Sequence, residues 1–88
     1  MTKEDIINEL SKGIVTKERL MEILEKSDKI DSHVLWAIAL NNNSDLDVLN
    51  RILNQEDKID PDVLYAIERN KNADESILKR VNKLINAF

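Results

Sequence analysis

The sequence contains no cysteine. This absence excludes disulfide bonds, thiolate nucleophiles and cysteine-bound metals. Glycine and proline occur once each, as Gly13 and Pro61. So few helix-breaking residues in a chain rich in leucine and isoleucine favour helices joined by short turns. The scarcity of glycine also excludes a glycine-rich loop that cradles phosphate groups.

Long apolar runs are also missing. The longest one, residues 34–40, is far too short to cross a bilayer. The first ten residues, MTKEDIINEL, carry acids where a signal peptide has an apolar core. We therefore expect a cytoplasmic protein that does not enter a membrane.

Positive charge is in the minority. The chain of 88 residues has 13 Lys and Arg against 17 Asp and Glu, a formal net charge of −4. Nucleic-acid binding usually needs a basic face, because phosphate contacts supply much of the affinity. The one mildly basic cluster is Lys79, Arg80 and Lys83, and at helical spacing such charges mostly form a solvated face. The composition, 42% apolar and 34% charged, fits one small globular domain.

The sequence repeats itself. The stretch KIDSHVLWAIALNNNSD at residues 29–45 returns 29 residues later as KIDPDVLYAIERNKNAD. The coinciding positions include Leu20, Leu49 and Leu78, Trp36 and Tyr65, Asn41 and Asn70, and Asn43 and Asn72. Such self-similarity is typical of repeat arrays and predicts three copies, at residues 2–30, 31–59 and 60–88. The first copy is degenerate, with Ile6, Ile7 and Leu10 in the apolar slots after a one-residue shift.

Each copy predicts two short helices. Residues that cap helix N-termini precede the expected starts: Thr2, Thr16, Asp31, Ser44 or Asp45, Asp60 and Asp74. Apolar residues then recur at i, i+1 and i+4, as in Val34, Leu35 and Ile38, which is helical spacing. The predicted helices span residues 3–12, 17–26, 32–41, 46–54, 61–69 and 75–86.

The first helix of each pair is expected to end at Gly13 or at the asparagine-rich segments 41–43 and 70–72, since Gly and Asn tolerate the left-handed conformation. Neither helix of a pair can bury its apolar stripe alone, so stacked pairs must share one core. The predicted fold is all-α, a right-handed stack of three helix–turn–helix repeats in a single domain.

The segments VLWAIALNNNSDLDVLNRIL and VLYAIERNKNADESILKRV resemble variant leucine-rich repeats and, more loosely, HEAT repeats. The resemblance covers residues 31–82 well and 2–30 weakly. The family's turn is usually proline-rich, whereas here it reads NNNSD and NKNAD, and residues 27–29 and 55–58 lengthen the period. Relatives with a cysteine-bound iron–sulfur cluster are excluded as guides. The resemblance implies an α-solenoid-like scaffold that binds other proteins, and it transfers no catalytic residue.

Catalytic and metal-binding patterns are weak. His33, the single histidine, lies in the segment Asp31–Ser32–His33, whose consecutive side chains diverge on a helix and cannot form a triad. We expect it at the surface. The spaced acids Asp28, Asp31, Asp57 and Asp60 lack the glycine and closing glutamate of a calcium loop. Neither an enzyme activity nor a metal or other cofactor is expected.

The aromatic residues Trp36 and Tyr65 share one slot of the repeat, on the side of the helix away from the main apolar stripe. Two interpretations compete. The rings either fill the seam between neighbouring pairs or line an exposed face that binds a partner. For Trp36 the seam is favoured, because helix 32–41 is apolar nearly all round. For Tyr65 the two are balanced, since its hydroxyl needs water or a partner.

These features favour a small non-enzymatic protein-interaction module, an adaptor or a stoichiometric inhibitor, whose partner has a basic surface. The candidate partner-binding residues are Trp36, Glu56, Asp57, Asp62, Tyr65, Glu68 and Arg69. The alternative is an accessory nucleic-acid-binding protein using Lys71, Lys79, Arg80 and Lys83. A small hydrolase built on carboxylates is the third hypothesis and the least favoured.

Overall fold

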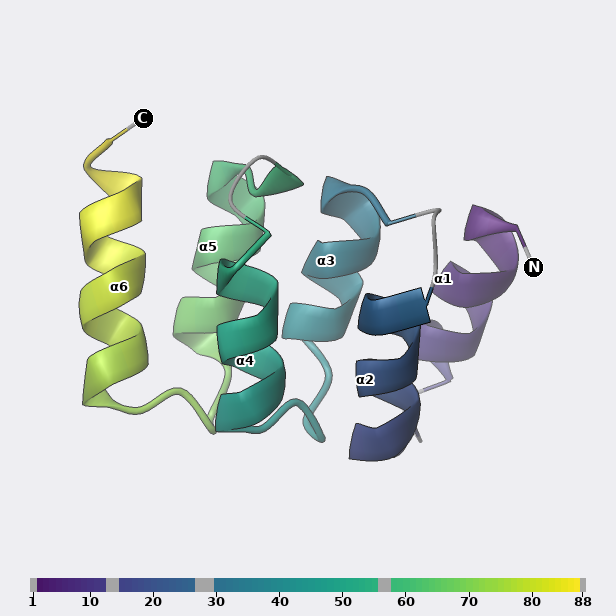
Figure 1. Ribbon diagram of the computed structural model, residues 1–88. Coiled ribbons are helices and arrows are strands. Elements are labelled where there is room, and N and C mark those ends of the chain that lie inside the picture. The colour runs from purple at the N-terminus through teal and green to yellow at the C-terminus, as the bar shows by residue number, and fades with distance from the viewer. Residues whose placement is uncertain (1, 13–14, 27–29, 56–57, 88) are drawn as a thin grey trace.

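The computed structural model describes residues 2–12, 15–26, 30–55 and 58–87 (Figure 1). This part of the chain forms six helices and no strand, so the all-α prediction is confirmed. The helices are α1 (Lys3–Ser11), α2 (Lys17–Lys26), α3 (Ser32–Ala39), α4 (Leu46–Leu53), α5 (Pro61–Arg69) and α6 (Glu75–Ile85). All six begin at the predicted residue, and the ends differ from the prediction by two residues at most.

The accurate helix starts follow from the caps. Each of the side chains of Asp31, Asp45, Asp60 and Asp74 accepts a hydrogen bond from the backbone N–H three residues on. At α1, Thr2 and Asp5 form a reciprocal capping box, and at α2 the Thr16 hydroxyl accepts from the N–H of Arg19. Of the two candidates for α4, Asp45 is the cap. Ser44 is fully buried and donates its hydroxyl to the carbonyl oxygen of Ile38 at 2.6 Å.

The helix ends use asparagine differently from the prediction. The backbone of Asn70 after α5 is extended, with φ −72° and ψ 127°, so the left-handed expectation is wrong there. Its side chain instead accepts from the N–H of Asn72 at 2.8 Å and donates to the carbonyl oxygens of Ala39 and Asn41 at 2.9 and 3.1 Å. Asn70 therefore joins two neighbouring helix pairs. Gly13 lies outside the described residues.

The helices lie in two layers, seen in Figure 1 as α1, α3 and α5 behind α2 and α4. Contacts join α1 to α3 and α3 to α5 within one layer, and α2 to α4 and α4 to α6 within the other. The pairs α3–α4 and α5–α6 join the two layers. The N- and C-termini lie at opposite ends of the row.

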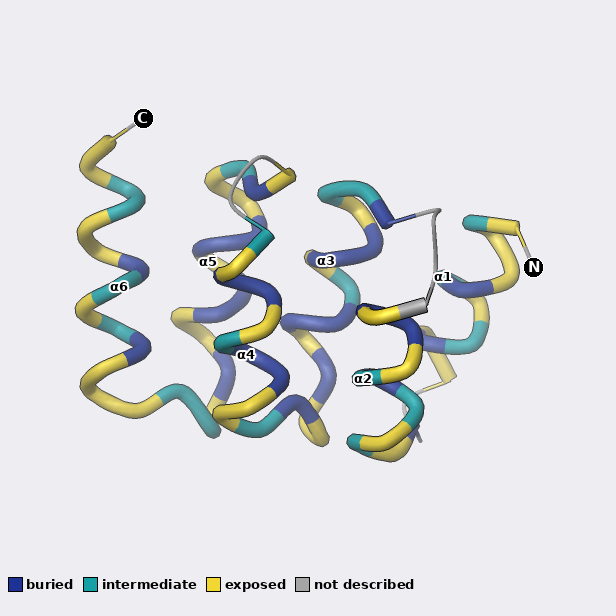
Figure 2. Tube along the Cα trace, viewed as in Figure 1, coloured by how far each residue is buried: buried dark blue, intermediate teal, exposed yellow. Residues whose placement is uncertain are grey.

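The core lies between the layers, where the buried stretches of neighbouring helices face one another in Figure 2. Among the fully buried side chains are Leu20 and Leu49, which share one repeat slot, while Leu78 in the third copy is half-buried. The caps Thr2, Asp31 and Asp60 are spaced by 29 residues and begin equivalent helices. At that spacing the buried Ile6 matches the buried Leu35. The one-residue shift expected for the first copy is therefore unnecessary.

The prediction that Trp36 is buried in a seam is wrong. Its side chain is 39% exposed, and Leu40, one turn on, is 44% exposed. A helix in the middle of such a row is covered by two neighbours and by the other layer, which leaves its fourth side open. In α3 the covered sides take Leu35 and Ile38, both fully buried. An apolar helix at this position therefore presents its remaining apolar residues to solvent.

Candidate functional site

The outer side of the α1–α3–α5 layer carries a row of apolar side chains, Ile7, Trp36, Leu40 and Tyr65, which we call the aromatic face. Ile7, Trp36 and Tyr65 occupy the same slot of the 29-residue repeat, on α1, α3 and α5 in turn. Tyr65 is 49% exposed. Exposed apolar side chains gathered on one face are typical of interaction sites, whereas scattered ones need no explanation.

The aromatic face is hollowed between its helices. Between α1 and α3, an apolar hollow of about 310 Å³ is lined by Ile7, Leu10, Trp36 and Leu40 among others. Between α3 and α5, a second hollow of about 270 Å³ is lined by Trp36, Leu40, Asp62, Tyr65, Ala66 and Arg69. The indole of Trp36 is a wall of both hollows and therefore stands at the centre of the face.

A third hollow lies near the N-terminal ends of α3 and α5. It has a volume of about 300 Å³ and is lined by Ser32, His33, Trp36, Asp60 and Asp62. We call it the acidic hollow. The rings of His33 and Trp36 lie 5.9 Å apart between centroids, tilted by 46°. An aromatic wall thus meets two carboxylates in one cavity, and His33 is exposed, as predicted.

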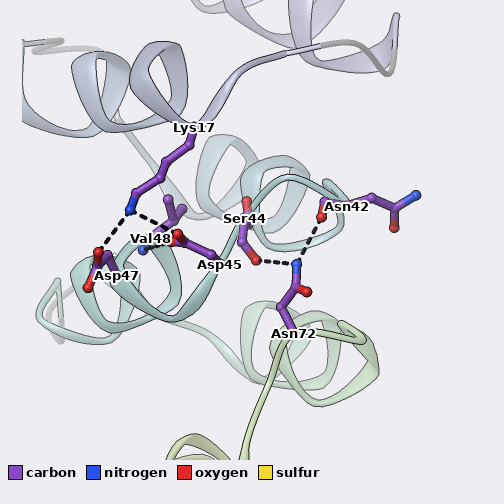
Figure 3. Close-up of polar contacts among 7 residues, drawn as sticks. All are labelled: Lys17, Asn42, Ser44, Asp45, Asp47, Val48 and Asn72. Carbon is purple, nitrogen blue, oxygen red and sulfur yellow. Dashed lines mark hydrogen bonds and ion pairs between the residues drawn. The ribbon is translucent and has the colours of Figure 1, made fainter.

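Lysines of the first copy neutralise two of the helix caps in the second. Lys3 at the start of α1 contacts the carboxylate of Asp31 at 2.8 Å, and Lys17 at the start of α2 contacts Asp45 and Asp47 at 2.9 Å each (Figure 3). These ammonium groups hold the pKa values of Asp31 and Asp45 below their ordinary value. In return, the hydrogen bonds to Asp45 and Asp47 raise the pKa of Lys17.

Side-chain amides and guanidinium groups link successive copies at matching positions. Asn43 donates to the carbonyl oxygen of Val15 at 2.6 Å, and Asn72 makes the corresponding bond to Ser44 at 3.0 Å (Figure 3). In the other layer, Arg51 contacts Glu25 at 2.9 Å. At the equivalent positions Arg80 donates to Asn54 at 3.3 Å and also to Asn50 at 3.0 Å. These polar contacts fix how the copies lie against each other and so hold the aromatic face in shape.

The structure brings four of the predicted partner-binding residues together: Trp36, Asp62, Tyr65 and Arg69 line one hollow. Glu68 is exposed on α5 and lies outside the hollows described above. Glu56 and Asp57 lie outside the described residues.

Sequence reasoning missed Ile7, Leu40 and Ser32. The available signal for Ile7 was the unshifted 29-residue alignment, which places it in the slot of Trp36. Leu40 gave no such signal, because an apolar residue at the end of an apolar helix is indistinguishable from a core residue. The signal for Ser32 was its alignment with Lys3, a long cation.

The basic residues of α6 are partly engaged. Arg80 donates to the two asparagines of α4, and Lys79 contacts Glu75 at 3.6 Å. Lys71 and Lys83 are exposed. The alternative nucleic-acid site is therefore divided between internal contacts and isolated charges.

No group of three or more His, Cys, Asp or Glu side chains in the described part of the chain is placed to hold a metal ion. Within the same residues, no helix combines the length and apolar character that a membrane crossing requires. Protein-family models, curated proteins and solved structures were compared with this chain, and none of them matches it.

Proposed function

We propose that this protein is a small, non-enzymatic protein-interaction module that binds its partner through the aromatic face. The observation that carries the proposal is the exposure of Trp36, Leu40 and Tyr65 on one side of one helix layer, around shared hollows. Tryptophan, tyrosine and arginine are the residues enriched at binding hot spots. Arg69 lies in the same hollow as Trp36 and Tyr65.

The construction of the face supports this proposal. Each of its helices is fixed by a capped start and by the core beneath it, so the exposed side chains project from rigid elements. A preformed surface loses little conformational freedom on binding, which favours affinity. An adaptor or a stoichiometric inhibitor needs no chemistry beyond such a surface. The resemblance to variant leucine-rich and HEAT repeats points the same way.

The two competing functions have less support. Nucleic-acid binding lacks a continuous basic face, because Arg80 and Lys79 have partners within the chain. A carboxylate hydrolase needs two acids with different environments facing one substrate. The acidic hollow does hold Asp60 and Asp62, but Asp60 already caps α5 through Val63.

A selection from a random displayed peptide library tests the proposal. We expect the immobilised protein to select peptides whose binding weakens by about tenfold or more in the Trp36→Ser/Tyr65→Ser double variant, the loss expected for hot-spot residues. Leu46→Ser is the matched control, since Leu46 is equally exposed at 38% but lies on α4 in the other layer.

Two results would contradict the proposal. In one, the selected peptides bind the double variant as well as the natural protein while circular dichroism shows both folded. In the other, no peptide is selected in repeated rounds. Loss of binding in Leu46→Ser alone would place the site on the other layer instead.

A further inference from the structure

We propose that the acidic hollow binds a lysine or arginine side chain presented by the partner protein. The inference rests on the proposed function and names the chemistry of the partner at one point of the aromatic face. The hollow is lined by Ser32, His33, Trp36, Asp60 and Asp62. Its argument comes from comparing two equivalent places in the same chain.

At the first place, the cap of α3 has a cation of its own. Asp31 uses one carboxylate oxygen, Oδ1, to accept from the N–H of Val34. Its other oxygen, Oδ2, contacts the ammonium group of Lys3 at 2.8 Å. Lys3 is the first residue of α1, the neighbouring helix in the layer. One carboxylate thus serves both a helix end and a lysine.

At the second place, 29 residues later, the cation is missing. Asp60 accepts from the N–H of Val63 through Oδ1, as Asp31 does from Val34. The position equivalent to Lys3 is Ser32, the first residue of α3. Serine is too short and has no charge, and among the described residues nothing forms an ion pair with Asp60 or Asp62. The remaining oxygen of Asp60 lacks the partner that Asp31 has.

The space that a lysine would fill is the acidic hollow itself. Ser32 and Asp60 line a cavity of about 300 Å³, which is large enough for a long basic side chain. The indole of Trp36 forms another wall, and indole faces attract ammonium and guanidinium groups. Charge, size and aromatic wall therefore specify the same occupant. The Asp62 carboxylate adds a second negative group at the rim.

The neighbouring apolar hollow shows what accompanies the cation. Trp36 is a wall of both cavities, so a cation in one and an apolar side chain in the other lie on either side of a single indole. A partner segment that places a basic residue close to an apolar residue fits both hollows at once. The protein's net charge of −4 favours the approach of such a basic segment.

Small probes test the cation preference directly. The three probes are Nα-acetyl-arginine amide, Nα-acetyl-lysine amide and the citrulline counterpart, which keeps the shape of arginine without its charge. In nitrogen–proton correlation spectra, we expect both cations to shift the amide signals of Ser32 and His33 and the indole signal of Trp36 saturably. We expect citrulline to bind at least about fivefold more weakly.

Two lysine substitutions separate the hollow from a general charge effect. Ser32→Lys restores the residue type of the first copy, and its ammonium should occupy the hollow and abolish probe binding in a folded protein. Leu46→Lys adds the same charge at the start of α4, the position equivalent to Lys17 of α2, and should leave probe binding unchanged. Asp60→Asn retains a capping side chain and should weaken the cationic probes.

Equal binding of arginine and citrulline probes, or unchanged binding in Ser32→Lys, would overturn the inference. Equal losses in Ser32→Lys and Leu46→Lys would do so too. Library peptides that need Trp36 and Tyr65 but bind Ser32→Lys normally would contradict the cation site while the proposed function stands. Cationic probes that fill the hollow when no library peptide binds the face would contradict the proposed function and leave the cation preference supported.

Discussion

The side-chain amide of Asn72 donates to the carbonyl oxygen of Ser44 at 3.0 Å and to that of Asn42 at 2.8 Å. Both acceptors belong to the turn between α3 and α4, so a side chain of one turn closes the backbone of the turn before it (Figure 3). Asn70 does the same for Ala39 and is itself buried. The turns between paired helices are thus bound to each other by amides.

Asn70→Asp should destabilise the protein by about 2 kcal/mol or more, because it removes a donor to two carbonyl oxygens and brings a carboxylate against them in a buried place. Urea unfolding followed by circular dichroism measures the change. Asn42→Asp is the matched control. Figure 3 shows the Asn42 side chain pointing away from Asn72, so the same substitution there should cost less than about 0.5 kcal/mol. Equal costs would mean that the loss comes from net charge alone.

The helices and their starts were predictable because their causes are local. A capping side chain and the spacing of apolar residues act within one turn of the chain, as at Asp31 with Val34. The core leucines were predictable from the 29-residue repeat.

The exposure of Trp36 was not predictable in this way. It depends on how many neighbours a helix has in the stack, which the residues of that helix do not encode. The role of Asn70 was hidden for a related reason, since its partners lie 29 and 31 residues earlier.

Leu49→Ala and Leu64→Ala should each destabilise the protein by about 2–5 kcal/mol, the usual cost of truncating a core leucine. Both side chains are fully buried. Leu46→Ala is the comparison, since that leucine is 38% exposed and should cost clearly less. Urea midpoints measured at constant unfolding slope provide the values. A loss below about 1 kcal/mol for both core variants would show that the 29-residue register misplaces the core.

Trp36 should fluoresce as a partly hydrated indole and be quenched by iodide in the folded protein, because its side chain is 39% exposed. It is the one tryptophan in the chain, so the signal needs no deconvolution. Trp36→Ala should cost less than the ~3–5 kcal/mol of a fully buried aromatic. Protein unfolded in urea gives the reference for complete access. Blue emission with resistance to iodide would return Trp36 to the interior and remove the centre of the aromatic face.

The ion pairs of Lys3 and Lys17 predict how acid destabilises the fold. Because Lys17 lowers the pKa of Asp45, folding favours the ionised carboxylate. That contribution is present above the ordinary aspartate pKa of about 3.9 and is lost as pH falls through the lower folded value. Lys17→Gln should therefore reduce stability near neutral pH, by less than about 1 kcal/mol because the pair is largely exposed. Near pH 2 the difference should vanish, since Asp45 is then neutral in both proteins. Lys83→Gln, on an exposed side chain of α6, controls for net charge. Urea unfolding of the three proteins across the acid range is the measurement, and a constant gap between Lys17→Gln and the natural protein would rule out this ion pair as its cause.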